Sequence, residues 1–256
     1  MKMKKQLPIA GCRLPVEKPE GSGHSFQIAN RKSRIANGFT IIELLAVIAV
    51  IGVLAEFTFS SLAVVKRRQH ISHTQAELGQ LTAAIDNYKT TYGFYPPDNA
   101  QGTNALAGNQ LYYELEGTFL DTTNGVFKTL DGSAQIAIGD VHTAFGVDGF
   151  INCNKPGAGE DSQPAKNFIH ELNPRQLGRS TNNTVGITIL VGSVGGPDQT
   201  YQPLGVSDLN PWRYKSSGTL ANNPGSYELY IQLVIGGKTN LVCNWSKQVQ
   251  INSPLP

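Results

Sequence analysis

A carboxylate, Glu43, lies near the start of an almost wholly apolar run that extends from Phe39 to Val65. Ionisable groups are costly inside a bilayer and usually mark function there. Glu43 follows Phe39 by four residues, roughly 6 Å along a helix. A cut before Phe39 would create an α-amine with an unperturbed pKa of about 7.7–8.0, and this amine would attract the carboxylate in an apolar helix bundle. If such a cut occurred, the new amine and the Glu43 carboxylate could pair.

Three cysteines could carry redox chemistry. Cys12 lies in the basic N-terminal segment, whereas Cys153 and Cys243 lie far downstream. Outside the cytoplasm the latter two could form a disulfide. Two separate buried thiols are an equal alternative, because a sequence does not place two cysteines within bonding distance.

The histidines give weaker signals. His70 and His73 fall on the polar side of an expected helix, where a solvated face is favoured over a metal pair because metal sites need further ligands nearby. Cys153 with His142 or His170 matches no familiar nucleophile arrangement. The sequence thus predicts no catalytic residues, no metal site and no cofactor, and the chain is not expected to be an enzyme.

The apolar run is long enough to cross a bilayer, which takes about 20 apolar residues. A secretory signal peptide has a shorter apolar core, with its small cleavage residue on the far side. Here the small residue, Gly38, lies on the near side. By itself the run is also compatible with an uncleaved signal anchor.

Charge is distributed unevenly along the chain. Residues 1–38 contain eight basic and two acidic side chains, a net charge of +6, which leaves thirteen basic and seventeen acidic side chains, or −4, in the remainder. This distribution follows the positive-inside rule, so we expect a cytoplasmic N-terminus and a C-terminal part that crosses the membrane. No basic region remains that would indicate nucleic-acid binding.

The pattern after Val65 predicts that the helix continues. Lys66, Arg67 and Arg68 mark the exit from the bilayer. Apolar residues then recur at spacings of seven, three, four, three and four, which is one face of a helix: Ile71, Leu78, Leu81, Ile85, Tyr88 and Tyr92. We expect one helix from about Phe39 to about Tyr92, ended by Gly93 and by the Pro96-Pro97 pair.

Residues 98–256, here called the body, are rich in turn residues, with short strand-like runs between them. The runs are Gln135–Ile138, Val185–Val191, Tyr227–Ile235 and Asn240–Ile251. In the third, apolar and more polar residues alternate, which predicts a sheet with one buried face, and Gly236-Gly237 would turn it into the last strand. We expect an α+β fold in which an antiparallel sheet packs on the amphipathic half of the long helix.

The run from Gly38 to Leu45, Gly-Phe-Thr-Ile-Ile-Glu-Leu-Leu, resembles the class III signal of type IV prepilins and of type II secretion pseudopilins. The resemblance implies that a membrane-embedded prepilin peptidase cuts after Gly38 and N-methylates Phe39. It also implies that Glu43 helps to set the register between neighbouring subunits of a filament.

Shorter matches lie downstream, at Tyr92–Pro97, Asn210–Tyr214, Tyr227–Tyr230 and Asn244-Trp245. They resemble the tyrosine-proline turn, the aspartate-proline-tryptophan-glycine segment, a strand and the closing tryptophan of major pseudopilins. The resemblance departs from that group in the loop Gly236–Asn240, which lacks the carboxylates that calcium needs, so no calcium site is predicted. Asp98 to Val206 looks like a large loop-rich insertion.

The resemblance implies four parts: a cytoplasmic leader (1–38) removed on maturation, a membrane-spanning half-helix (39–65), an amphipathic half-helix with its terminating turn (66–97), and a periplasmic body (98–256). The implied partners are the prepilin peptidase, copies of the chain and other pilin-like subunits, an inner-membrane assembly platform and membrane lipid. A subunit of a type II secretion pseudopilus is the leading hypothesis. The alternatives are a type IV pilus pilin, major or minor, and a membrane-anchored binding or enzymatic domain that uses the same signal.

Overall fold

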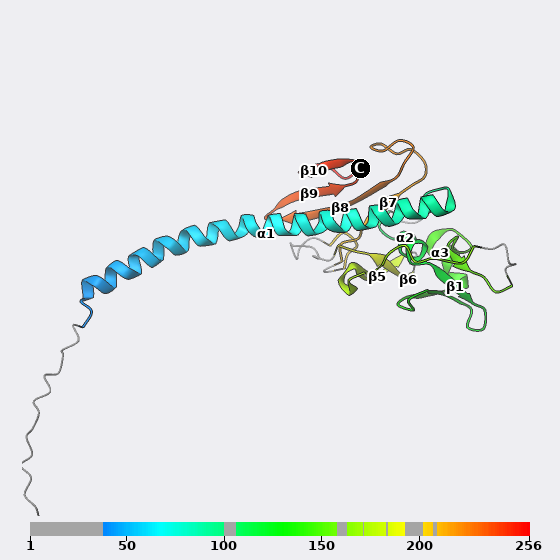
Figure 1. The fold of residues 1–256 in the computed structure, drawn as a ribbon, viewed down its shortest axis with the longest axis horizontal. Helices are drawn as coiled ribbons and strands as arrows, with labels where there is room; N and C mark the ends of the chain where they lie inside the picture. Colours follow the sequence, from blue (N-terminus) through cyan, green and yellow to red (C-terminus); the bar gives the residue numbers. More distant parts are fainter. Residues whose placement is uncertain are drawn as a thin grey trace, which may run out of the picture. The chain divides into compact units, whose positions relative to one another are not determined.

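A long helix dominates the structure, a computed structural model that describes residues 38–99, 106–157, 163–170, 172–182, 184–192, 202–206 and 209–256. The side chains of residues 57–63 are also outside the description. The helix, α1, covers Ile41–Tyr92 (Figure 1). It ends as predicted, because the Gly93 N–H donates to the Lys89 carbonyl (2.7 Å) and Gly93 has a φ of +86°, a conformation that favours glycine. The prediction of one continuous helix is confirmed.

The chain divides into two compact units, Met1–Gly52 and Val53–Pro256. In the described part of the first unit, the large apolar side chains are exposed, from Phe39 (79% exposed) onward along α1. The leader and Cys12 lie outside the described residues. Among the residues that are described, no helix has a stretch long and apolar enough to cross a membrane.

The second half of α1 buries the face that the spacing predicts. Leu81, Ile85 and Tyr88 are fully buried, while Ile71, Leu78 and Tyr92 are half-buried against the same core. Thr74 is buried on this face too, where its hydroxyl donates to the His70 carbonyl (3.0 Å). An apolar face of this kind stabilises a helix mainly by packing on other elements.

Two groups of elements surround this part of α1, with the β7–β10 sheet on one side in Figure 1 and the remaining helices and strands on the other. After α1 the described chain forms α2 (Leu111–Glu116), β1 (Thr118–Asp121), β2 (Val126–Thr129), β3 (Gln135–Ala137), α3 (Ile138–Phe145), β4 (Cys153–Asn154), the 3-10 helix η1 (Pro174–Gln176), β5 (Leu177–Asn182), β6 (Val185–Leu190), β7 (Arg213–Lys215), β8 (Glu228–Ile235), β9 (Lys238–Cys243) and β10 (Ser246–Ile251).

The β10-β9-β8-β7 sheet is antiparallel throughout. Ile235 pairs with Lys238, so Gly236-Gly237 forms the predicted two-residue hairpin turn. Both glycines have positive φ, +59° and +72°, as the mirror-image hairpin turn requires. The run expected to form the last strand is divided in two by a turn at Asn244-Trp245.

The expectation that β8 buries one face is wrong for most of the strand. Its first six residues are buried on both faces. Leu229 and Ile231 face the main core, and Tyr230 on the opposite face packs with Leu241, Cys243 and Trp245 in a second small cluster. The ring centroids of Tyr230 and Trp245 are 5.5 Å apart. The hairpin that follows β8 therefore covers the face that alternation assigned to solvent.

The expectation of a single antiparallel sheet also needs correction, because the described chain has three sheets. One has the order β3-β2-β1-β4 and contains a short parallel pairing of β1 with β4, and another is the antiparallel β5-β6 hairpin. The stretch 98–206, expected to be loop-rich, holds these elements together with α2 and α3. Their strands are two to six residues long, too short for alternation to stand out among turn residues.

Candidate functional site

The bond between Gly38 and Phe39 lies in non-helical chain just before α1. Both residues are exposed, and a Cβ built on Gly38 would meet nothing within 4 Å. A protease needs an exposed, extended backbone that it can bind. This geometry is compatible with cleavage after Gly38.

Thr40 and Glu43 together cap the start of α1. The Glu43 Oε2 accepts hydrogen bonds from the Thr40 backbone N–H and hydroxyl, both 2.9 Å, and the Glu43 N–H donates to the Thr40 Oγ1 (3.3 Å). This reciprocal pattern is a capping box. The sequence predicts a helix that starts at about Phe39. The capping box explains why the helix begins at Ile41 instead.

The capping box gives Glu43 a partner, Thr40, within its own chain. Both hydrogen bonds to its carboxylate end on Oε2, and no described residue donates to Oε1. A carboxylate accepts several hydrogen bonds, and this one is exposed. It can therefore cap its own helix and accept a bond from a second molecule at the same time.

Exposed apolar side chains surround this carboxylate. Ile41 and Ile42 are 81% and 76% exposed, and the pattern continues along the helix to Leu54. Contiguous apolar surface of this extent marks an interaction site with protein or lipid. The arrangement offers one polar group, Glu43, within a surface that favours association.

A buried polar network fixes the other end of α1. Glu114 of α2 is fully buried and accepts from the Ile151 N–H, the Asn152 N–H and the Tyr88 hydroxyl, each at 3.0 Å. The Tyr92 hydroxyl donates to the Asn152 Oδ1 (2.8 Å). Two consecutive turns of α1 are thus bonded to α2 and to the chain before β4.

The electrostatics of this network follow from its burial. Desolvation raises the pKa of Glu114, while its three hydrogen bonds act in the opposite direction. Burial and the nearby Glu114 raise the pKa of Tyr88, so the tyrosine hydroxyl stays protonated and remains a donor. The network is a positioning device for α1, with no reacting group exposed to solvent.

A neighbouring carboxyl gives the body a pH dependence. Burial, followed by the charge of Asp131, raises the pKa of Glu116 from 4.5 to about 7. Between these pH values the folded protein holds a proton that the unfolded chain releases. The contribution of Glu116 to stability is therefore full below about pH 4.5 and is lost as the pH rises through 7.

Replacing Glu116 with glutamine should weaken this pH dependence. The Asn167 side chain donates to the Glu116 Oε1 (2.6 Å), and a glutamine oxygen could still accept that bond. We expect the fall in the free energy of unfolding between pH 5 and pH 7.5 to be smaller in Glu116→Gln than in the wild type. The part of this fall that comes from the raised pKa of Glu114 should remain in the variant. Urea unfolding of the chain in detergent at both pH values measures this. Equal falls in the two proteins would contradict the assignment.

Two of the short segments that resemble parts of major pseudopilins, Tyr92–Pro97 and Asn210–Tyr214, contact each other in the structure. The Tyr214 hydroxyl and the Ser216 hydroxyl both donate to the Pro96 carbonyl, at 2.7 and 2.8 Å. Asp98 accepts from the Ser216 and Ser217 N–H groups. The tyrosine-proline turn after α1 is thus bonded to the segment around Trp212, which is itself buried.

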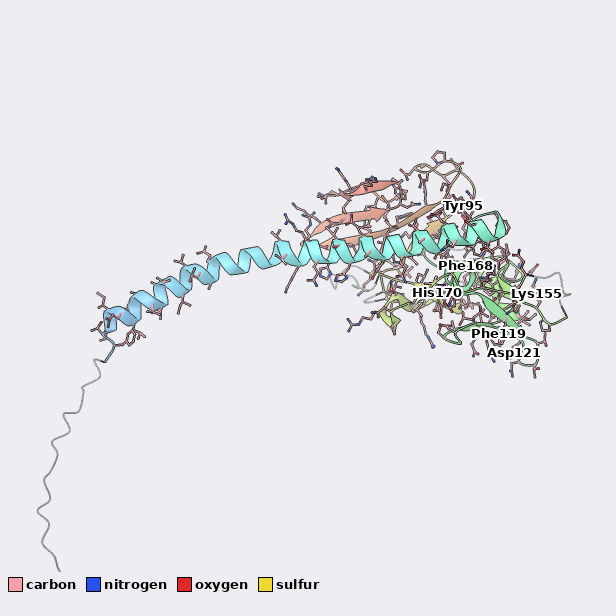
Figure 2. All side chains as sticks on the ribbon, viewed as in Figure 1. Tyr95, Phe119, Asp121, Lys155, Phe168 and His170 are labelled. Atoms are coloured by element: carbon pink, nitrogen blue, oxygen red, sulfur yellow. The ribbon has the colours of Figure 1, made fainter. Side chains whose placement is uncertain are left out.

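Aromatic contacts hold the same turn from two directions. Tyr95 packs on Tyr227 (4.9 Å between ring centroids) and lies under the Lys89 ammonium, whereas Phe168 packs on Tyr92 (6.0 Å between ring centroids). Figure 2 labels Tyr95 and Phe168 on opposite sides of the C-terminal end of α1 in that view.

The other two segments of this kind, Tyr227–Tyr230 and Asn244-Trp245, also contact each other. The Leu229 N–H donates to the Asn244 Oδ1 (3.0 Å), and the Asn244 amide donates to the Tyr227 carbonyl (2.9 Å). With the Tyr230–Trp245 ring contact, these bonds fix the turn between β9 and β10 against β8. The four downstream matches therefore stabilise the body in two pairs. One pair joins β7 to the turn after α1, and the other joins β8 to the turn between β9 and β10.

The cysteines do not form the bond that the sequence left open. Cys153 in β4 and Cys243 in β9 are both free and buried, and they belong to different sheets and different core clusters. The structure shows the other alternative, two separate buried thiols. Burial raises the pKa of each thiol, which disfavours the reactive thiolate.

The histidines also lie apart. His142 pairs with Asp148 (2.9 Å) on an exposed surface, and His70 and His73 lie on α1. Among the described residues, no three His, Cys, Asp or Glu side chains gather in a way that could hold a metal ion. In the loop Gly236–Asn240, the Asn240 Oδ1 accepts from the Arg67 guanidinium (2.9 Å).

Sequence reasoning missed Glu114 and Asn152. A signal was present, because Glu114 stands within the apolar and aromatic run Leu111–Leu115, much as Glu43 does in its own run. The sequence did not show its hydrogen-bond donors, because the N–H groups of Ile151 and Asn152 lie 37 and 38 residues away along the chain.

Comparison with known proteins shows a similarity to a fimbrial protein. The chain is 29% identical to the fimbrial protein EcpC of Eikenella corrodens over 119 residues, which is 46% of this chain and 78% of that protein. No protein-family model matches the chain, and no solved structure matches it. The similarity supports a relationship to fimbrial proteins and a subunit of the pilus type.

Proposed function

We propose that this chain is the precursor of a pilus-type filament subunit. In this proposal the Phe39–Val65 segment anchors it in the bacterial inner membrane, with the leader in the cytoplasm and the body in the periplasm. Prepilin peptidase cuts after Gly38 and N-methylates Phe39. The mature chain then polymerises through the N-terminal part of α1 with copies of itself and other pilin-like subunits, on an inner-membrane assembly platform.

The observation that carries the proposal is the start of α1. An exposed Gly38-Phe39 bond is followed directly by a capped helix with one carboxylate and an otherwise apolar, exposed surface. Lipid covers such a surface before assembly, and neighbouring helices cover it afterwards. The similarity to a fimbrial protein supports the same interpretation.

A secretion pseudopilus is the second candidate for the filament. The tyrosine-proline turn and the segment Asn210–Tyr214, both of which resemble parts of major pseudopilins, are bonded to each other through Tyr214 and Pro96. Deletion of the gene in its host separates the two. Loss of surface pili supports a pilus subunit, whereas loss of secreted proteins from the medium with pili intact supports a pseudopilin.

Glu43 provides the test of assembly. In a filament, its carboxylate would accept the N-terminal amine of an adjacent subunit, which offsets burial of both charges and fixes their axial offset. We expect Glu43→Ala and Glu43→Gln to be inserted and cleaved but poorly incorporated. The measurement is filament yield relative to processed subunit in the membrane.

The capping box supplies the controls. Glutamine at position 43 retains the cap, since the motif accepts Glu or Gln, but it lacks the charge. Thr40→Val removes the cap hydroxyl and keeps the charge, so it should assemble close to normally. If Thr40→Val fails as badly as Glu43→Ala while Glu43→Gln assembles well, Glu43 acts only as a helix cap.

A further inference from the structure

A groove of about 750 Å³ lies between α1 and the β9–β10 hairpin. Leu78, Gly79 and Ala83 line it on the helix side. The sheet side presents the apolar side chains of Val242, Trp245 and Val249 among polar neighbours that include Ser246 and Gln248. All of these residues belong to the unit Val53–Pro256, so the groove is a feature of one compact part of the chain.

The helix side of the groove is a line of exposed positions that contains two small residues. Gln75, Gly79, Ala83 and Asp86 are spaced four, four and three residues apart, all exposed and all lining the groove. Residues at these spacings lie along one side of a helix. Small residues in such a line let a second helix approach the backbone closely.

The chain's own fold gives no reason for a glycine at this place. A Cβ added to Gly79 would meet nothing within 4 Å. Glycine inside a helix is nevertheless less stable than alanine. The space above Gly79 is therefore open to something outside the described chain.

We propose that this groove receives the apolar N-terminal part of α1, residues 44–54, from a second copy of the chain. The inference rests on the proposed function and assigns a partner surface to it. The same segment is helical, and its large apolar side chains are exposed. It is the most extensive apolar surface that the described chain leaves uncovered, and the fimbrial similarity supports association of identical subunits.

Charge favours the same occupant. Residues 44–54 contain no ionisable side chain, so no charge is desolvated along the segment when it enters the groove. Asp86 and Lys247 are exposed groove residues of opposite sign, which leaves the groove neutral. A strongly charged partner segment would bring charges into the groove that its residues do not balance.

Leucine substitutions test the groove in the full chain, in its native host. Ala83→Leu and Gly79→Leu place a branched side chain in the groove, whereas Ala76→Leu makes the same change on α1 at an exposed position outside it. We expect filament yield per processed subunit to fall about tenfold in the two groove variants and to stay near the wild-type value in Ala76→Leu. Thermal unfolding should show all three folded, because Ala83, Ala76 and Gly79 are exposed.

Normal filament yield in both groove variants, or an equal loss in Ala76→Leu, would overturn the groove assignment while leaving the proposed function in place. Absence of filaments from the wild-type chain under conditions where processed subunit accumulates would overturn both.

A photo-crosslinking amino acid at position 83 identifies the occupant. With isotopically light and heavy subunits mixed in one filament, the expected product is a light–heavy crosslink to a peptide containing residues 44–54. A crosslink to a different protein, or to the body of the second copy, would overturn this occupant, as would assembled filaments without any crosslink at position 83.

Discussion

Replacing Gly38 with valine should leave the N-terminal leader attached to nearly all of the chain. The Gly38–Phe39 bond is exposed and non-helical, and a Cβ added at residue 38 would meet nothing within 4 Å. Valine at this position therefore does not disturb the chain itself. The expected block comes from the peptidase, whose site takes a small residue before the cut bond. N-terminal sequencing and intact mass of the protein from its native host measure the outcome.

Gly38→Ala is the matched control, because alanine is small and should permit partial processing. The melting temperature of the body should be the same in both variants, since a Cβ added at residue 38 meets nothing within 4 Å. Recovery of a Gly38→Val chain that begins at Phe39 in normal amount would show that cleavage does not depend on this glycine. A mature wild-type chain that begins elsewhere would remove the basis of the proposed processing.

Replacing Glu114 with leucine should destabilise the body by about 3 kcal/mol. Leucine has a similar size but leaves the Ile151 and Asn152 N–H groups and the Tyr88 hydroxyl without their acceptor in a fully buried place. Unpaired buried donors are more costly than the net gain from the bonds they lose. Urea unfolding of the chain in detergent, followed by circular dichroism, measures the loss.

A double-mutant cycle with Tyr88→Phe separates the hydrogen bonds from simple packing. In the wild-type background, Tyr88→Phe removes one donor to Glu114 and should cost about 1 kcal/mol. In the Glu114→Leu background, the same change removes a donor that already lacks its partner, so its cost should be markedly smaller. Additive losses would mean that the two side chains act independently and that the network does not hold α1 as a unit.

The consequence of this network for a filament is geometric. Tyr88 and Tyr92 bind the last turns of α1 to residues of α2 and to Asn152, and Tyr95 holds the following turn against Tyr227. In the proposed filament, these contacts would keep the body fixed on the last turns of α1. Glu114→Leu should weaken that attachment.

Local features of the sequence determined much of α1 and of the last hairpin. The spacing of Leu81, Ile85 and Tyr88 was enough to predict the buried face, since helical periodicity and one-sided burial arise within a few turns of chain. Gly93 and Gly236-Gly237 were predictable for the same reason, because each adopts the positive φ that its own turn requires. The motif from Gly38 to Glu43 was equally local, and its role in processing and assembly stays a prediction.

Only the tertiary structure decided what depended on distant partners. Glu114 became a buried acceptor because Tyr88 and Asn152, from segments 26 and 38 residues away in the sequence, donate to it. The second face of β8 became buried because the following hairpin brings Trp245 onto Tyr230. Residue order sets which turns and helix faces can form, but the burial of a side chain depends on the segments that fold against it, and those contacts carry no local periodicity in the sequence.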